Sequence, residues 1–259
     1  MAAPAAAAIP PDGPSPAAWA APQDGPSPAA WAAPQETKSR RNPIVFAALA
    51  VAGLVIVGFV VLTFIGANLT PYDQASIRVG QRLEADPAFK AKYGDIDHDK
   101  AAETGIALVR DGVNRVDDPT QLTLFRATSK VIDLADPKTC AAIAQGSEAP
   151  DTVVPILKQL DQPTLDAYFD ATATAALASV HADPVRAAPT DEEQTSAGTA
   201  WTTAVGADAF QKDLGILQSP TGHTDADVCA AERELIHAAL QLDDADRSTI
   251  IRIVYTGQN

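Results

Sequence analysis

Apolar side chains recur at every third or fourth position through most of the chain after residue 70. One such face runs through Ala102, Ile106, Val109, Val113 and Val116. Further faces with this spacing comprise Val153, Leu157 and Leu160; Phe210, Leu214 and Leu217; and Val228, Ala231, Leu235, Ala239 and Leu242. Residues three and four positions apart share one side of an α-helix, so the pattern predicts amphipathic helices. No stretch of the sequence shows the sustained alternation that is typical of a β-strand.

Four Asp-Pro pairs mark helix boundaries in this part of the chain. They are Asp86-Pro87, Asp118-Pro119, Asp136-Pro137 and Asp183-Pro184. Aspartate accepts hydrogen bonds from the free amides of a first helical turn, and proline at the next position has no amide to leave unpaired. We predict that the first three pairs begin helices. We interpret the fourth pair as the end of the preceding helix, because Pro189 follows soon after.

Two threonine patterns predict further helix starts. Thr190 with Glu193 fits a capping box, and Thr224 with Asp227 is a weaker version of it. The segment Ile250–Tyr255 is ambiguous, because it is rich in β-branched residues but follows acids that resemble a helix start. The consistent solution for residues 71–259 is an all-α domain of about nine or ten helices, each about 9–20 residues long.

The segment 44–66 is uniformly apolar. It reads IVFAALAVAGLVIVGFVVLTFIG and contains no charged residue. As a helix rising about 1.5 Å per residue, it spans roughly 34 Å, which is enough to cross a hydrocarbon core of about 30 Å. Backbone polar groups inside lipid must bond internally, which favours a helix. We therefore predict a single transmembrane helix over residues 44–66, in contact with the lipid bilayer.

The charges that flank this segment predict its orientation. Lys38, Arg40 and Arg41 precede it, whereas the first positive charge after it is Arg78. The positive-inside rule then places the N-terminus in the cytoplasm and residues 71–259 on the periplasmic or extracellular side of the plasma (inner) membrane. We favour an uncleaved signal anchor over a cleaved signal peptide, whose apolar run is only about 7–15 residues long and lies near the chain start.

Residues 1–43 form a tail rich in proline and alanine. It contains a tandem 12-residue repeat over 11–22 and 23–34. Proline fixes φ and donates no backbone hydrogen bond, so we predict a disordered tail that samples extended states. The repeat places Trp19 and Trp31 at matching positions, which fits either a docking peptide or a duplicated linker.

The net negative charge of the chain lies entirely in the part that follows the apolar segment. The formal net charge is −14, and residues 71–259, with 16 basic and 30 acidic side chains, carry all of it. A nucleic-acid-binding protein needs a basic surface to neutralise phosphates, so nucleic acid is excluded as an expected partner. An acidic surface instead attracts basic partners or divalent cations.

Cys140 and Cys229 are the only two cysteines. An even number of cysteines in an oxidising outer compartment predicts a disulfide, and two buried free thiols are the alternative. Trp201, the one tryptophan outside the tail, is interpreted as a core residue, with a ligand groove as the alternative.

No motif predicts a catalytic residue, a cofactor or a metal ligand. The four histidines, His98, His181, His223 and His237, include no pair with i,i+4 spacing. The segment 95–99 resembles the start of a calcium loop, but Lys100 and Ile106 stand where an EF-hand needs glycine and glutamate. A loose cation site at this segment stays open as an alternative.

The layout as a whole is common among bacterial envelope proteins. It combines a proline-rich tail, a basic flank, one apolar span and a helical outer domain. It predicts a membrane-anchored protein that acts by binding or scaffolding an envelope partner, rather than an enzyme. The alternative is a membrane-anchored envelope hydrolase of unrecognised type, which would need a cleft holding two carboxylates, or a histidine with a nucleophile.

Overall fold

The computed structural model describes residues 69–94, 96, 98–147 and 150–256. These residues fold into eleven α-helices and contain no β-strand. The helices are α2 (Pro71–Ala85), α3 (Pro87–Tyr93), α4 (His98–Gly112), α5 (Asp118–Leu134), α6 (Pro137–Ala144), α7 (Pro150–Leu157), α8 (Gln162–Val180), α9 (Asp191–Val205), α10 (Ala207–Gln218), α11 (Asp225–Gln241) and α12 (Asp244–Thr256). The all-α prediction is confirmed, and the ambiguous segment Ile250–Tyr255 is helical within α12.

The capping residues begin helices much as predicted. Four of them accept backbone N–H groups of the helix that they precede: Asp86 (α3), Asp136 (α6), Thr190 (α9) and Thr224 (α11). The start of α5 differs by one residue, because Asp117 rather than Asp118 accepts the N–H of Thr120, at 3.0 Å. Asp183 lies just beyond the end of α8, also as predicted.

The predicted number and lengths of the helices are wrong in detail, because the described residues form eleven helices rather than nine or ten. Three helices are shorter than the expected range, since α3 has seven residues and α6 and α7 have eight each. Asp86 both ends α2 and caps α3, which makes two helices from adjoining segments. The apolar face that runs to Val116 is also shorter than predicted, because α4 ends at Gly112. Val113 and Val116 are nevertheless buried beyond its end.

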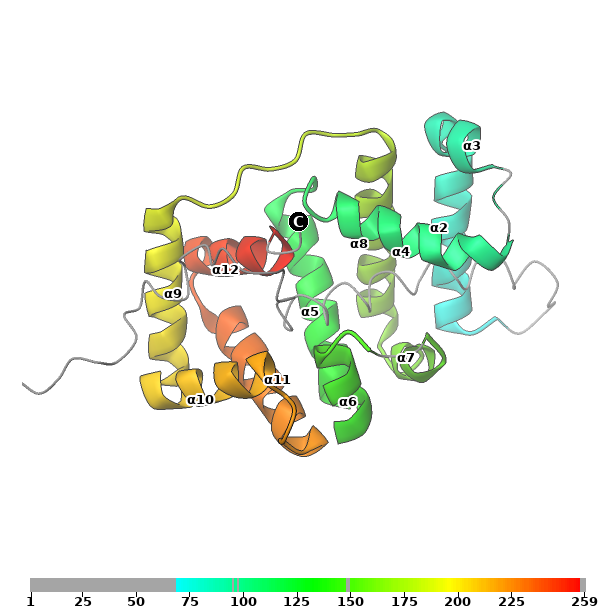
Figure 1. Cartoon of the computed structure of the whole chain (residues 1–259). Helices are drawn as coiled ribbons and strands as arrows, with labels where there is room; N and C mark the ends of the chain where they lie inside the picture. Colours follow the sequence, from blue (N-terminus) through cyan, green and yellow to red (C-terminus); the bar gives the residue numbers. More distant parts are fainter. Residues whose placement is uncertain (1–68, 95, 97, 148–149, 257–259) are drawn as a thin grey trace, which may run out of the picture.

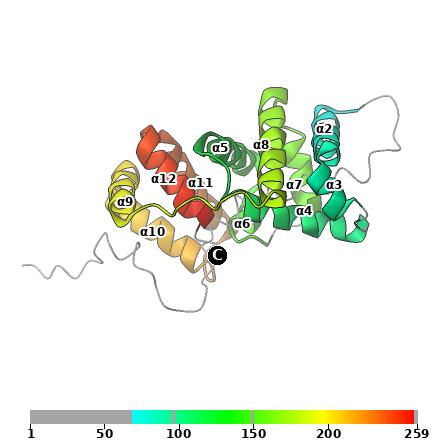
Figure 2. The same ribbon diagram turned by 90° about the horizontal axis from the view of Figure 1, so that it is seen from above.

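The helices form an elongated row of two lobes that meet at α5 (Figure 1). In one lobe α8 packs against α2 and α4, and in the other α11 packs against α6, α9 and α10, while α12 packs against α9. Because α5 contacts α8 on one side and α11 and α12 on the other, it lies between the lobes (Figure 2).

Small side chains allow close helix packing in the first lobe. Gly112 of α4 lies against the backbone of α8, where an added Cβ would be 1.7 Å from the carbonyl oxygen of Ala175. Larger side chains fill the remaining space, and the buried ring of Phe169 meets Tyr72 of α2 edge-on, with ring centroids 5.4 Å apart. The high alanine content therefore builds a core of closely spaced helices rather than a loose one.

An irregular segment, residues 181–190, connects α8 to α9 and runs along both lobes (Figure 1). Arg186 holds this segment against the start of α5. Its backbone N–H donates to the carbonyl oxygen of Asn114 at 2.9 Å, and its Nη1 donates to the Asp118 carboxylate at 2.5 Å. The connection thereby fixes Asp118 close to the second lobe.

Candidate functional site

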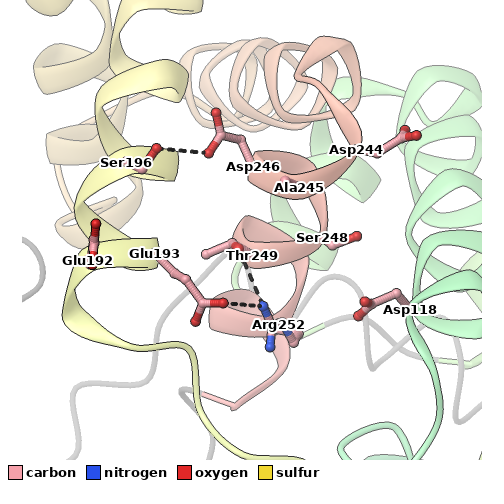
Figure 3. Close-up of a pocket in the computed structure, with 10 residues that line it drawn as sticks. All are labelled: Asp118, Glu192, Glu193, Ser196, Asp244, Ala245, Asp246, Ser248, Thr249 and Arg252. Atoms are coloured by element: carbon pink, nitrogen blue, oxygen red, sulfur yellow. Dashed lines mark hydrogen bonds and ion pairs between the residues drawn. The ribbon is translucent and has the colours of Figure 1, made fainter.

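A pocket of about 510 Å³ opens between α9 and α12, facing the start of α5 (Figure 3). It is lined by Asp118, Glu192, Glu193, Ser196, Asp244, Ala245, Asp246, Ser248, Thr249 and Arg252. Five carboxylates and one guanidinium thus share one concave site, which contains no large apolar side chain. No sequence pattern predicts this pocket.

The acidity of the pocket comes from helix starts. Asp118 is the first residue of α5, Glu192 and Glu193 lie in the first turn of α9, and Asp244 and Asp246 lie in the first turn of α12. Carboxylates are favoured at these positions because the free N–H groups of a first turn carry partial positive charge. Helix chemistry alone explains each acid, whereas the tertiary fold brings the three groups together.

Arg252 joins the two walls of the pocket. Its Nη2 lies 3.7 Å from Oε1 of Glu193 and donates to Oγ1 of Thr249 at 3.4 Å (Figure 3). Further along the same walls, the hydroxyl of Ser196 donates to Asp246 at 3.3 Å. The Arg252–Glu193 and Ser196–Asp246 contacts link α12 to α9.

Glu193 is held in its ionised form. The backbone N–H of Thr190 donates to its carboxylate at 2.7 Å, and this hydrogen bond is the largest cause that lowers the pKa of Glu193. The nearby Arg252 guanidinium lowers that pKa further. This carboxylate is therefore suited to attract a cation rather than to act as a proton donor.

Two guanidiniums behind the pocket neutralise part of its charge. Arg186 pairs with Asp118, and Arg247 pairs with Asp244. Together with Arg252, three guanidiniums face five carboxylates, which leaves the site two charges negative. Within the described part of the chain, the carboxylate of Glu192 has no hydrogen bond or ion pair and is free to meet a ligand.

The carboxylates are too widely spread to form a metal centre. No group of three or more His, Cys, Asp and Glu side chains that could hold a metal ion is found in the described ranges. A divalent cation needs several oxygen ligands at one point. The arrangement is better suited to several separate positive charges. Positions 95 and 97 of the suggested calcium segment lie outside the described residues.

The two predicted cysteines lie at disulfide distance. The sulfur atoms of Cys140 in α6 and Cys229 in α11 are 2.02 Å apart, and their Cα atoms are 5.3 Å apart. Both side chains are buried. The pair joins helices that are 89 positions apart in sequence and does not line the pocket, so its role is to tie α11 to α6.

The predicted topology residues cannot be placed in the structure. Lys38, Arg40, Arg41, the apolar segment 44–66 and the repeat-containing tail 1–43 all lie outside the described residues. Of the helices that are described, none has both the length and the apolar character that a membrane span requires.

Trp201 lies in the core, as predicted. It is 6% exposed, its Nε1 donates to the carbonyl oxygen of Leu235 at 2.9 Å, and its ring meets Phe210 edge-on. Two histidines pair with surface carboxylates: His181 with Asp86 and His237 with Asp133, each at 2.9 Å. These contacts are structural and lie away from the pocket residues.

Sequence reasoning missed one fully buried acid. Glu232 of α11 is 0% exposed, and neither carboxyl oxygen has a hydrogen-bond partner among the described residues. Burial raises the pKa of Glu232 to about 8, so the carboxyl is mainly protonated at neutral pH. The sequence does indicate its burial, because Glu232 lies four residues after Val228 and three before Leu235, on the predicted apolar face.

The pocket, the net charge of the domain and its buried groups are the features from which a function can be proposed. No protein-family model, curated protein or solved structure matches this chain.

Proposed function

We propose that this chain is a single-pass membrane-anchored cell-envelope protein whose helical domain acts by binding a basic segment of an envelope partner. The observation that carries the binding role is the pocket between α9 and α12, where carboxylates from the starts of three helices leave a net negative charge. The anchor would be residues 44–66, oriented by Lys38, Arg40 and Arg41, with the helical domain on the periplasmic or extracellular side.

The distribution of charge favours a polybasic ligand over a single ion. Glu192 lies on α9 and Asp246 on α12, and Arg252 lies beside Glu193 rather than beside either of them (Figure 3). Lysine or arginine side chains of an extended segment could each meet a different carboxylate. The negative charge of the whole domain would also speed the approach of such a partner.

A hydrolase has weaker support at this pocket. Glycoside hydrolysis needs a carboxyl that stays protonated until it donates to the leaving group. Glu193 instead has a lowered pKa and contacts both Thr190 and Arg252. A carboxylate held in this way stays ionised and does not supply the proton. Binding is therefore the function that the geometry of the pocket favours.

The proposal is tested by titrating the full-length chain with a fluorescent deca-lysine peptide and measuring anisotropy. The variant Glu192→Gln/Asp246→Asn removes two pocket charges and preserves side-chain shape. We expect it to weaken binding by roughly 0.4–2 kcal/mol, or about twofold to thirtyfold in Kd, because each exposed charge pair contributes about 0.2–1 kcal/mol.

The matched control is Glu84→Gln/Glu103→Gln, which removes the same charge from exposed positions on α2 and α4 in the other lobe. We expect it to bind the peptide almost as tightly as the parent. An equal loss of affinity in both double variants would show that net charge alone attracts the peptide. That outcome, or the lack of any binding by the parent, would contradict the pocket as the binding site.

A further inference from the structure

Glu232 occupies an unusual position in the second lobe. It lies on α11 three residues after Cys229, which is bonded to α6, and three before Leu235, whose carbonyl oxygen accepts from Trp201 of α9. Its neighbours along the same side of the helix, Val228, Leu235 and Ile236, are also buried. A carboxyl group in such surroundings can remain only in its neutral form, because an unpaired buried charge is strongly unfavourable.

The ionisable groups on the five helices packed against α11 do not neutralise this carboxyl. Several of them have partners of their own, among them Asp133 of α5, paired with His237; Glu193 of α9, near Arg252 of α12; and Arg247 of α12, paired with Asp244. Asp213 of α10 and Tyr255 of α12 are buried. Burial is the sole cause of the raised pKa of Glu232, so none of these groups contributes to it.

The contacts of α11 differ in kind from one side of the helix to the other. Toward α6 the helix is held by the Cys140–Cys229 pair. Toward α5, the guanidinium of Arg233 donates to the carbonyl oxygens of Ile132 and Ala135, each at 2.8 Å. Toward α9 and α10, the one hydrogen bond among the described residues is that from Trp201 to the carbonyl oxygen of Leu235. The interface with α9 and α10 therefore depends mainly on apolar packing, which a buried charge and entering water would weaken.

We propose that Glu232 makes the packing of α11 against α9 and α10 depend on a proton. While protonated, the carboxyl stays in the core. When it loses the proton, the carboxylate draws water in from the α9–α10 side, and α11 remains tied to α6 and α5. This device is independent of what occupies the acidic pocket, and it would let the domain respond to the pH of its compartment.

Trp201 reports on this interface directly, because its indole bridges α9 and α11. The experiment uses the full-length chain with Trp19→Phe and Trp31→Phe, so that Trp201 is the only tryptophan and the only source of tryptophan fluorescence. Emission maximum and acrylamide quenching are followed from about pH 6 to about pH 9, which brackets the pKa of Glu232. A non-reducing gel checks that the cysteine pair stays intact throughout.

We expect the emission of the parent to shift to the red and the quenching constant to rise several-fold as the pH increases. Glu232→Gln and Glu232→Met should both show a flat response, and either one suffices if the other does not fold. Asp213→Asn, which removes the other buried acid, should respond like the parent. A flat response in the parent, a preserved response without Glu232, or its loss in Asp213→Asn would overturn the proposal.

Discussion

Replacing Glu232 with glutamine should shift the free energy of unfolding in favour of the variant, relative to the parent, by up to about 5 kcal/mol as the pH rises from 4.5 to above 8. The pKa of this carboxyl rises from 4.5 to about 8 on burial. Each unit of pKa corresponds to about 1.4 kcal/mol, so the whole difference corresponds to about 5 kcal/mol. Opening of the α9–α10 side would make the observed value smaller, because it hydrates the carboxylate without global unfolding.

The sign of this effect follows from proton binding. Between pH 4.5 and about pH 8 the unfolded chain has released the Glu232 proton while the folded chain keeps it. The contribution of Glu232 to stability is therefore fully present below pH 4.5, falls as the pH rises, and levels off above about pH 8. Glutamine cannot titrate, so the variant lacks this decline.

Urea unfolding followed by circular dichroism at several pH values measures the difference between parent and variant. A buried amide adds its own constant penalty, so the pH dependence of the difference is the informative quantity. We expect the difference to move in favour of the variant as the pH rises. If the two unfolding curves kept a constant separation across this range, Glu232 would not be buried as a neutral acid.

Replacing both cysteines with alanine should lower the free energy of unfolding by roughly 2–5 kcal/mol. The pair closes a loop across a sequence separation of 89 residues. The entropy that this closure removes from the unfolded chain corresponds to about 4.6 kcal/mol in the loop model, and native-state strain commonly reduces the observed gain. Alanine is preferred to serine because both positions are buried, where a new hydroxyl would lack a partner.

The measurement is the urea midpoint of the double variant Cys140→Ala/Cys229→Ala beside that of the oxidised parent. The parent should show a similar fall in the urea midpoint once it has been unfolded and reduced, because it then lacks the same covalent link. The single variants should resemble the double variant for the same reason. An unchanged midpoint in all of them would mean that the bond is absent from the parent or does not stabilise the folded state.

Much of the helical fold could be predicted from local sequence. Capping residues such as Asp136 and Thr190 mark helix starts through hydrogen bonds to neighbouring amides, which depend on only a few adjacent positions. The lengths of the short helices α3, α6 and α7 were harder to predict than their positions, because each spans barely two turns. The close approach at Gly112 depends on α8, a helix some 60 positions away, and has no local signal.

The candidate site could likewise be predicted only in part, because some of its features depend on tertiary packing. The acids Glu193 and Asp246 are recognisable as first-turn residues of their helices, but nothing in the sequence indicates that α9 and α12 lie side by side. The pairing of Cys140 with Cys229 could be predicted because no other cysteine competes. Glu232 could have been found by following the apolar face of α11 through every position, including the charged one.

The most direct test concerns the proposal that the helical domain lies outside the plasma membrane, since the oxidised cysteines and the envelope partner both depend on it. Val185 is 51% exposed in the segment between α8 and α9, so Val185→Cys offers an accessible thiol. Ser39→Cys places one in the N-terminal flank of the apolar segment. Intact cells are treated with a membrane-impermeant maleimide. We predict that Val185→Cys is labelled directly and Ser39→Cys only after permeabilisation, and the reverse pattern would contradict the proposed topology.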